Sequence, residues 1–223
     1  MSEIRICDTH AHYDDQKFDG DREKLLGELL PAAGVSLVVN VGAEMKGAEE
    51  SVRLAGKYPY LYAACGIHPD ESGVFEEGEM AMCRLHDLLQ HKKAVAVGEI
   101  GLDYHWMVEP KETQIRWFRE QLRLAAELDL PVNVHSREAA QDTFDQIREN
   151  YDAGHFTGGI IHCYSGSVEM AREYVKMGYR IGIGGVVTFK NAKTLVSVVQ
   201  DIPIEYLVTE TDCPYLAPEP HRG

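Results

Sequence analysis

Short apolar runs alternate with amphipathic stretches along the whole of this 223-residue chain. The runs are rich in valine, isoleucine and alanine, which is typical of parallel strands buried on both faces. They predict eight strands, at residues 4–9, 36–41, 61–65, 94–99, 132–135, 159–162, 180–183 and 206–210. The amphipathic stretches predict seven connecting helices, at residues 21–33, 46–57, 79–91, 111–128, 138–150, 168–177 and 192–200.

The helix predicted at 111–128 has the clearest periodicity. Its apolar residues recur every three or four positions, the spacing of one helix face: Ile115, Phe118, Leu122, Ala125 and Leu128. Pro131 is expected to end the connection that follows it. We expect Asp19 or Asp21 to cap the first helix and Asn191 to cap the last, because short polar side chains satisfy free backbone N–H groups there.

The alternation of strands and helices predicts an α/β fold of the TIM (β/α)8 barrel type. No low-complexity linker or short repeat divides the chain, so residues 1–223 are expected to form one domain. The pattern lacks the last helix of a complete barrel, because the chain stops soon after the eighth predicted strand. The eighth and first strands are therefore expected to meet with one side uncovered.

Metal-ligating residue types stand at the ends of five of these predicted strands. In parallel barrels the C-terminal strand ends meet at one face and carry the chemistry. The sequence therefore predicts one metal site built from His10, His12, Glu99, His135, His162 and Asp212. Taken singly, each histidine also fits an ordinary loop or a packed core, and the glutamate fits an exposed surface.

The types of these ligands indicate the chemistry of the predicted site. His10 and His12 share one face of a strand, since side chains two apart do so. Imidazoles suit zinc or manganese better than magnesium. Glu99 could bridge two cations, and Asp212 could accept a proton from a metal-activated water. Asp103 and Glu210 could orient the metal ligands by contacting them on the side away from the metal.

Other polar and aromatic residues near the strand ends are candidates for contacting substrate. His68 and Arg137 are placed to reach substrate oxygens, and arginine suits phosphate; a helix cap and a surface arginine are the alternatives. Four aromatic residues near the strand ends could either stack on nucleic-acid bases or pack in the barrel mouth: Tyr104, Trp106, Tyr164 and Tyr215.

Composition excludes several classes of protein. A net charge of −14 argues against a broad basic surface for nucleic acid, although bound metal can offset it locally. No apolar run is long enough to span a membrane and no signal-peptide pattern precedes the first strand, so we expect a cytoplasmic protein. The 5 cysteines lack a CxxC pair and are expected to act mostly as small buried hydrophobes, without a helper for a catalytic thiol.

Six motifs make the chain resemble the TatD family of metal-dependent deoxyribonucleases. They are DTHAH (8–12), GIHPD (66–70), VGEIGLDY (97–104), PVNVHSR (131–137), IHCYSG (161–166) and TETDCPYLAP (209–218). The resemblance implies a TIM-like barrel with one or two divalent ions, Zn, Mn or Mg. It implies hydrolysis of DNA phosphodiester bonds, from the 3′ end of single strands, in DNA repair or degradation. Members usually continue beyond the equivalent of Gly223 into a last helix.

The resemblance also implies a role for each matching residue. His10 and His12 would hold one metal ion, and Glu99 would bridge. His135 and His162 would hold the second ion. Asp212 would be both ligand and base. His68 and Arg137 would touch the scissile phosphate. Among the aromatic residues at the loop ends, Tyr164 is predicted as a substrate contact.

Two other classes of function stay open on sequence alone. A small-molecule hydrolase of the lactonase, amidase or phosphotriesterase type could use the same barrel, and the acidic composition favours it. No lysine stands at a predicted strand end, which argues against hydrolases that use a carboxylated lysine. A metal-dependent binding or scaffold protein is the other alternative. A monomer is favoured, although a partner chain could cover the eighth strand.

Overall fold

The computed structural model describes residues 5–71, 78–155 and 158–222. In these residues eight parallel strands form one sheet, and their order in the sheet is their order in the chain. The strands are β1 (Ile6–Ala11), β2 (Val35–Gly42), β3 (Leu61–Cys65), β4 (Ala94–Asp103), β5 (Val132–Arg137), β6 (Gly159–Ile161), β7 (Tyr179–Ile183) and β8 (Leu207–Thr209). This parallel order confirms the predicted barrel topology.

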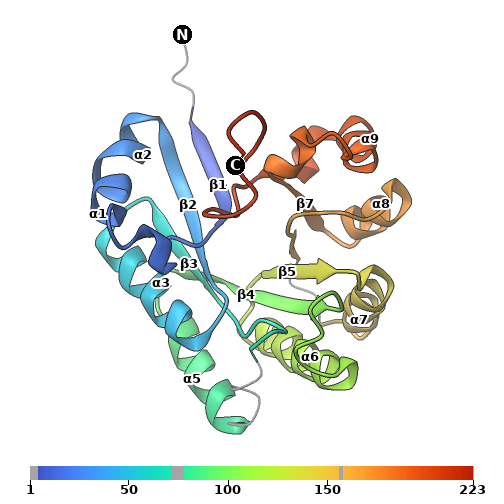
Figure 1. Ribbon diagram of the computed structural model, residues 1–223. Coiled ribbons are helices and arrows are strands. Elements are labelled where there is room, and N and C mark those ends of the chain that lie inside the picture. Colours follow the sequence, from blue (N-terminus) through green and yellow to red (C-terminus); the bar gives the residue numbers. More distant parts are fainter. Residues whose placement is uncertain (1–4, 72–77, 156–157, 223) are drawn as a thin grey trace.

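Helices connect the strands and lie outside the sheet (Figure 1). They are α1 (Arg22–Lys24), η2 (Leu25–Leu29), α2 (Leu30–Ala32), α3 (Met45–Lys57), α5 (Glu79–Leu89), α6 (Lys111–Glu127), α7 (Ala140–Asp152), α8 (Val168–Lys176) and α9 (Lys193–Asp201). Short 3₁₀ turns are η1 (Gln16–Phe18), η3 (Gly185–Thr188) and η4 (Ile204–Tyr206).

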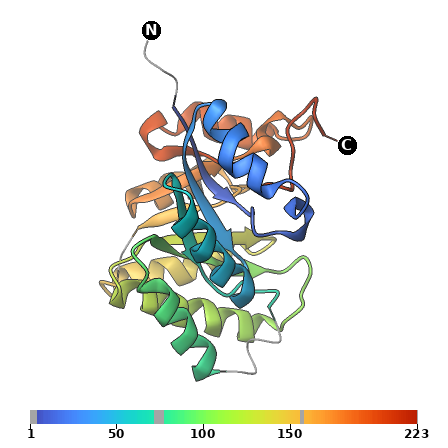
Figure 2. The same cartoon turned by 90° about the vertical axis from the view of Figure 1, so that its left-hand side faces the viewer.

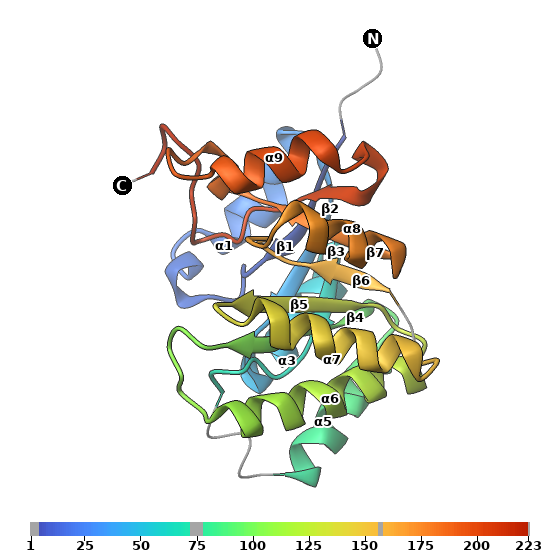
Figure 3. The same ribbon diagram turned by 90° about the vertical axis from the view of Figure 1, so that its right-hand side faces the viewer.

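The sheet curls into a nearly closed barrel with the helices around it. Figure 2 shows the blue to green helices α1 to α5 in front of the strands on one side of the molecule. Figure 3 shows α6, α7, α8 and α9 following one another along the other side. Each amphipathic helix buries its apolar face against the strands; in α6 these residues include Trp117, Phe118 and Leu122.

Hydrogen bonds join β8 to β1 at the end of the barrel where the predicted ligands lie. The Asp212 backbone N–H donates to the His10 carbonyl at 2.9 Å, and the His12 N–H donates to Cys213 at 2.9 Å. The buried Asp8 carboxylate accepts from the N–H of Thr211 at 3.0 Å and from its hydroxyl at 2.7 Å. These bonds place the residues after β8 directly beside His10 and His12.

The predicted elements agree with the observed ones apart from their ends. All eight strands occur where they were predicted, although residue 4 lies outside the described residues. The main difference is β4, which extends to Asp103 and therefore places Glu99 inside the strand. The helix predicted at 21–33 is divided by a π-helical turn at Leu25–Leu29.

One of the two predicted helix caps is at its predicted position. Asp21 is the N-cap residue of α1, although its side chain makes no capping hydrogen bond. The cap of α9 is Ala192 rather than Asn191, since the helix begins one residue later than the side chain of Asn191 requires.

No helix of the described residues is long and apolar enough to cross a membrane.

Among the cysteines, Cys65 is buried as predicted, whereas Cys7 and Cys83 are exposed. Cys7 is exposed because it lies early in β1, where that strand is solvent-accessible.

Candidate metal centre

The six predicted ligands lie together in the half of the barrel that holds the C-terminal ends of the strands, with Glu99 inside β4. An open cavity of about 1060 Å³ leads to them, and His12, Glu99, His135, His162 and Asp212 line it. His10 lies beneath, fully buried. The sequence therefore predicted correctly which side chains meet, although their roles are not tested by their position alone.

Three histidines present the same ring nitrogen to the centre, and an acceptor lies near the other one. His10 Nδ1 lies 2.9 Å from Asn133 Oδ1, and His12 Nδ1 lies 2.7 Å from the carbonyl oxygen of Val41. His162 Nδ1 lies 3.3 Å from Glu210 Oε1, an ion-pair distance without hydrogen-bond geometry. In His10 and His12, an N–H on Nδ1 satisfies the acceptor and leaves the lone pair on Nε2, as in many histidine–metal sites.

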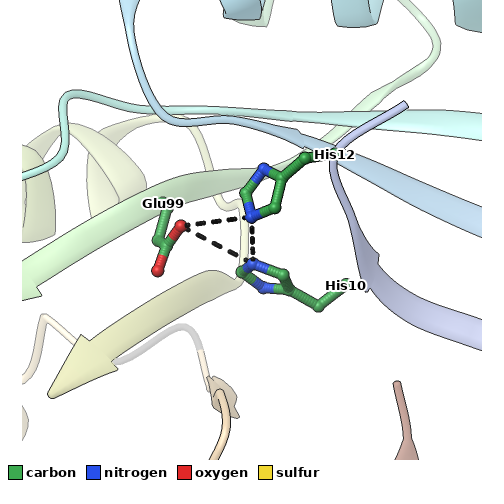
Figure 4. A group of neighbouring side chains, drawn as sticks. All are labelled: His10, His12 and Glu99. Carbon is green, nitrogen blue, oxygen red and sulfur yellow. Dashed lines mark hydrogen bonds and ion pairs between the residues drawn. The ribbon is translucent and has the colours of Figure 1, made fainter. Parts of the chain in front are cut away.

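The free ring nitrogens converge on a small volume. His10 Nε2 and His12 Nε2 are only 3.1 Å apart, and both rings point toward Glu99 (Figure 4). The His162 ring stacks on the His10 ring at 3.5 Å between centroids. Two facing lone pairs repel each other unless a proton or a cation lies between them, so this donor set fits a bound cation.

Glu99 lies between two groups of histidines. Its Oε2 is 3.5 Å from His10 Nε2 and 3.8 Å from His12 Nε2. Its Oε1 is 2.9 Å from His135 Nδ1 and 3.8 Å from His68 Nε2. One carboxylate that offers a different oxygen to each group has the arrangement of a bridging ligand.

The second group is anchored by Asp103, the last residue of β4. His135 Nε2 lies 2.9 Å from Asp103 Oδ2, so Nδ1 is the nitrogen that faces Glu99. Gly101 pairs with His135 across β4 and β5. Its φ of 140° is a backbone conformation that glycine adopts readily. A Cβ at this position would lie 2.0 Å from the His135 carbonyl oxygen. This close approach lets the two strands align Asp103 with His135.

His68 lies nearer the ligands than the sequence indicated. It was predicted to contact substrate, yet its ring packs against His135 at 4.5 Å between centroids. Potential ligand atoms of His68, Glu99 and His135 lie within 4.8 Å of one another, a spacing that could hold a metal ion. The same holds for His10, His12 and Glu99, and for His10, His162 and Asp212.

Burial and the nearby charges shift the pKa values of these groups. Burial alone lowers the pKa of His135, but hydrogen bonds with Asp103 and Glu99 outweigh it and raise the pKa to about 9. The pKa of His12 is shifted in the same way. Burial alone lowers it, but Asp212 and Glu99 raise it to about 9. Burial lowers the pKa of His68 to about 3, so this imidazole is neutral at pH 7.

Asp212 lies at the boundary between the ligands and the cavity. Its Oδ1 is 3.3 Å from His12 Nε2, 3.7 Å from His10 Nε2 and 3.8 Å from His162 Nε2. Burial alone raises its pKa, but the hydrogen bond with His12 and the charges of the other imidazoles lower it overall. The carboxylate is thus ionised and partly open to the cavity.

The predicted substrate contacts divide into two kinds. Arg137 ends β5 and lines the cavity, as do Trp106 and Tyr215. Tyr164 does not line it: it is 4% exposed, and its hydroxyl donates to the Ser167 carbonyl at 2.6 Å. We therefore correct the prediction for Tyr164, whose ring packs in the core against Tyr174.

Sequence reasoning missed the partners behind the ligands. Asn133 is buried in β5, and its amide oxygen holds His10. A polar residue inside an apolar strand, two positions before His135, was the available signal, because both side chains share one face. The Val41 carbonyl carries no signal in sequence, since every residue has one. Glu210 and Asp103 were predicted correctly as groups near the ligands.

Comparisons with known proteins agree with this geometry. The model of the family described as TatD related DNase matches residues 7–223. YabD of Bacillus subtilis (strain 168), named as an uncharacterized metal-dependent hydrolase, is 41% identical over 218 residues, which are 98% of this chain and 84% of that protein. TatD of Cronobacter sakazakii, named as a 3′-5′ ssDNA/RNA exonuclease, is 32% identical over 96% of this chain and 80% of its own length.

A solved structure supports the same relationship. The crystal structure of YjjV, a TatD homolog from Escherichia coli K12, superposes with a TM-score of 0.85 and 34% identity. The match covers 98% of this chain and 83% of that one. Family, fold and ligand geometry agree, and the chain belongs to the TatD family of metal-dependent hydrolases.

Proposed function

We propose that this protein hydrolyses phosphodiester bonds in DNA, as a 3′-5′ exonuclease on single strands. The observation that carries the proposal is the convergence of four imidazoles and two carboxylates at the floor of an open cavity with Arg137 on its wall. The printed name of the Cronobacter sakazakii relative supports the choice of substrate.

The donor set fits one or two divalent ions, Zn, Mn or Mg. Ion-holding roles are proposed for His10, His12, Glu99, His135, His162 and Asp212, with Glu99 as the bridge. Such ions lower the pKa of a water molecule and neutralise phosphate oxygens when bound. Imidazole donors favour zinc or manganese over magnesium on purification.

The protein's own residues then bind the phosphate and move the proton. Asp212, ionised and facing the cavity, accepts the proton that water loses as it attacks phosphorus. The bond from phosphorus to the 3′-oxygen of the preceding nucleotide breaks, and that leaving oxygen takes up the proton. His68 and Arg137 hold the non-bridging phosphate oxygens, His68 as a neutral imidazole and Arg137 as a cation. Glu99 is buried at 4% exposure. Its negative charge lies next to the histidines, where the reaction needs it.

The test is hydrolysis of a 5′-labelled single-stranded oligonucleotide by metal-free protein, with Mg²⁺, Mn²⁺ and Zn²⁺ added back separately. We expect a ladder that shortens from the 3′ end, and its loss in Glu99→Ala and Asp212→Asn. Glu120→Ala, an exposed glutamate on α6, is the matched control. Cleavage that survives Asp212→Asn would contradict the assigned base.

A small-molecule hydrolase is the second candidate, and the lining of the cavity favours it. Eleven aspartate or glutamate side chains line the cavity, against four of lysine or arginine. An acidic wall repels a polyanion and accepts a neutral ester more readily. Lactones, amides and phosphotriesters tested beside the oligonucleotide separate the two: turnover of these alone would establish the second function.

A further inference from the structure

We propose that two nucleotide subsites flank the metal centre, one formed by Trp106 with Arg137 and the other by Tyr215 with Lys17. Each subsite combines an exposed aromatic ring, on which a base can stack, with a cation that can meet a phosphate. The inference rests on the proposed function, since it takes single-stranded nucleic acid as the ligand, and it adds where the strand lies.

The two rings follow strands on opposite sides of the barrel. Trp106 follows β4 and Tyr215 follows β8, and these strands are four apart in a sheet of eight that curls into a barrel. Both residues line the cavity that also contains Glu99 and Asp212. A strand that touches both rings therefore passes over the metal centre.

The first subsite is tied to the ligand His135 through one carboxylate. The Trp106 backbone N–H donates to Asp103 Oδ1 at 2.9 Å, while Asp103 Oδ2 lies 2.9 Å from His135 Nε2. The Trp106 ring is 62% exposed. The guanidinium carbon of Arg137 lies 5.4 Å from the centre of that ring, close enough for a cation–π contact.

The second subsite is tied to Asp212 through the backbone. The Tyr215 backbone N–H donates to the Asp212 carbonyl at 2.8 Å, and Tyr215 follows Asp212 by three residues, as Trp106 follows Asp103. Its hydroxyl donates to Asp15 Oδ2 at 2.6 Å, and Lys17 Nζ lies 4.0 Å from the ring centre. The ring is 44% exposed and lies 6.3 Å from the His12 ring.

The excess of carboxylates in the cavity lining explains why a bound strand would need base stacking. With carboxylates in excess along the wall, a continuous basic track for the backbone is absent from the described lining residues. Base–aromatic stacking does not depend on such a track, and it tolerates any sequence because every base has a π face. Each cation lies over one face of its ring, Arg137 over Trp106 and Lys17 over Tyr215, so a base would stack on the opposite face.

The other aromatic candidates are unsuited to this role. Tyr164 is buried, as described above. Tyr104 does not line the cavity that contains Glu99 and Asp212, whereas Trp106 and Tyr215 do.

Tryptophan fluorescence gives a direct test of binding. The chain has 2 tryptophans, and Trp117 is 5% exposed in the core. Zinc-loaded protein would be titrated with a tetrathymidylate linked by phosphorothioates, which resist hydrolysis. We expect quenching in wild type and in Trp117→Phe, and none in Trp106→Phe, because only Trp106 can stack on a base. An abasic tetramer should not quench.

Kinetics on a cleavable oligonucleotide test both subsites. Stacking energies predict that Trp106→Ala and Tyr215→Leu each raise KM by about 5- to 100-fold. The change in kcat should be several-fold smaller, because the ligands stay in place. Trp106→Phe and Tyr215→Phe retain a ring and should recover most of the loss. Methyl p-nitrophenyl phosphate, which carries no base, should be affected much less than the oligonucleotide.

The outcomes separate this inference from the proposed function. Quenching without hydrolysis under any metal would overturn the nuclease function and support the subsites. Hydrolysis without quenching, with KM unchanged in Trp106→Ala and Tyr215→Leu, would support the nuclease function and overturn the subsites. Neither quenching nor hydrolysis would overturn both.

Discussion

His10 and His12 are each oriented by a hydrogen-bond acceptor on the other ring nitrogen. Asn133 provides the acceptor for His10, and the Val41 carbonyl provides it for His12. Fixing the tautomer and the ring plane before a metal arrives reduces the entropy lost on binding, and such partners affect affinity nearly as much as ligands do.

Asn133→Ala should weaken metal binding while preserving the fold. The variant leaves His10 Nδ1 without its acceptor, and loss of such a partner typically costs about 10- to 100-fold in metal affinity. Competition with a zinc-binding dye measures the change. Asn191→Ala, on an exposed asparagine, is the control and should bind as wild type. Equal affinities for both variants would show that Asn133 does not orient the ligand.

Metal binding should release protons and become tighter as the pH rises. His12 and His135 have pKa values raised to about 9 by neighbouring carboxylates, so both are protonated in the metal-free protein at pH 7. A ligating nitrogen must first lose that proton, so apparent affinity rises from pH 6 toward 9 and levels off above it. Calorimetry at pH 7 in buffers of different ionisation enthalpy counts the protons.

The number of protons released should fall in His12→Gln, because one of the two protonated ligands is then missing. His86→Gln, at an exposed histidine on α5, should leave the proton count unchanged. A count of zero in the wild-type protein would contradict the raised pKa values.

At the scale of elements, the site depends on how closely α3 approaches the strands. Gly42 ends β2, and a Cβ there would lie 2.3 Å from the backbone nitrogen of Ala48 in α3. Only glycine permits this contact, which brings the start of α3 to the wall of the cavity, where Gly47 and Lys46 lie. Interiors are packed so densely that one extra methyl group has nowhere to go.

Gly42→Ala should therefore destabilise the protein by about 1–3 kcal/mol, the usual range for overpacking. Gly56→Ala is the matched control, because it lies in α3 with no atom within 4 Å of its Cβ position. That change should be neutral or stabilising by up to about 1 kcal/mol, because alanine favours helix more than glycine does. Urea unfolding measures both, and equal stabilities would refute the close approach.

At the scale of the whole molecule, a net charge of −14 and an acidic cavity must coexist with the proposed anionic substrate. Long-range attraction cannot bring the strand to the site, so binding has to come from local contacts: the metal ions, two cations and two rings. Nucleases with basic tracks lose affinity steeply with salt because many counterions are released.

Binding of the phosphorothioate tetramer should depend only weakly on salt. Arg137 and Lys17 neutralise two phosphates in our proposal, and about −0.7 per phosphate gives a slope of about −1.4 in a plot of log affinity against log salt. Titrations between about 50 and 200 mM NaCl measure it. Arg137→Gln should reduce the slope by about half. A slope of −4 or steeper would indicate a basic surface elsewhere.

The sequence alone determined the barrel and the set of side chains at its centre. Strand β3 has the predicted bounds, Leu61–Cys65, and the other strands differ only at their ends. This succeeds because buried parallel strands are written as local apolar runs, and their C-terminal ends must meet on one face whatever the details of packing. The predicted ligands His10, His135 and Asp212 could be grouped from these strand ends alone.

The surroundings of each of these side chains came from the packing of the whole barrel. It placed Asn133 behind His10, extended β4 so that Asp103 holds His135, brought His68 beside Glu99 and buried Tyr164. These outcomes depend on distances between residues far apart in the chain, on strand register and on which face of a ring is covered. Local patterns of hydrophobic and polar residues do not encode such distances, because they arise only when all eight strands pack together.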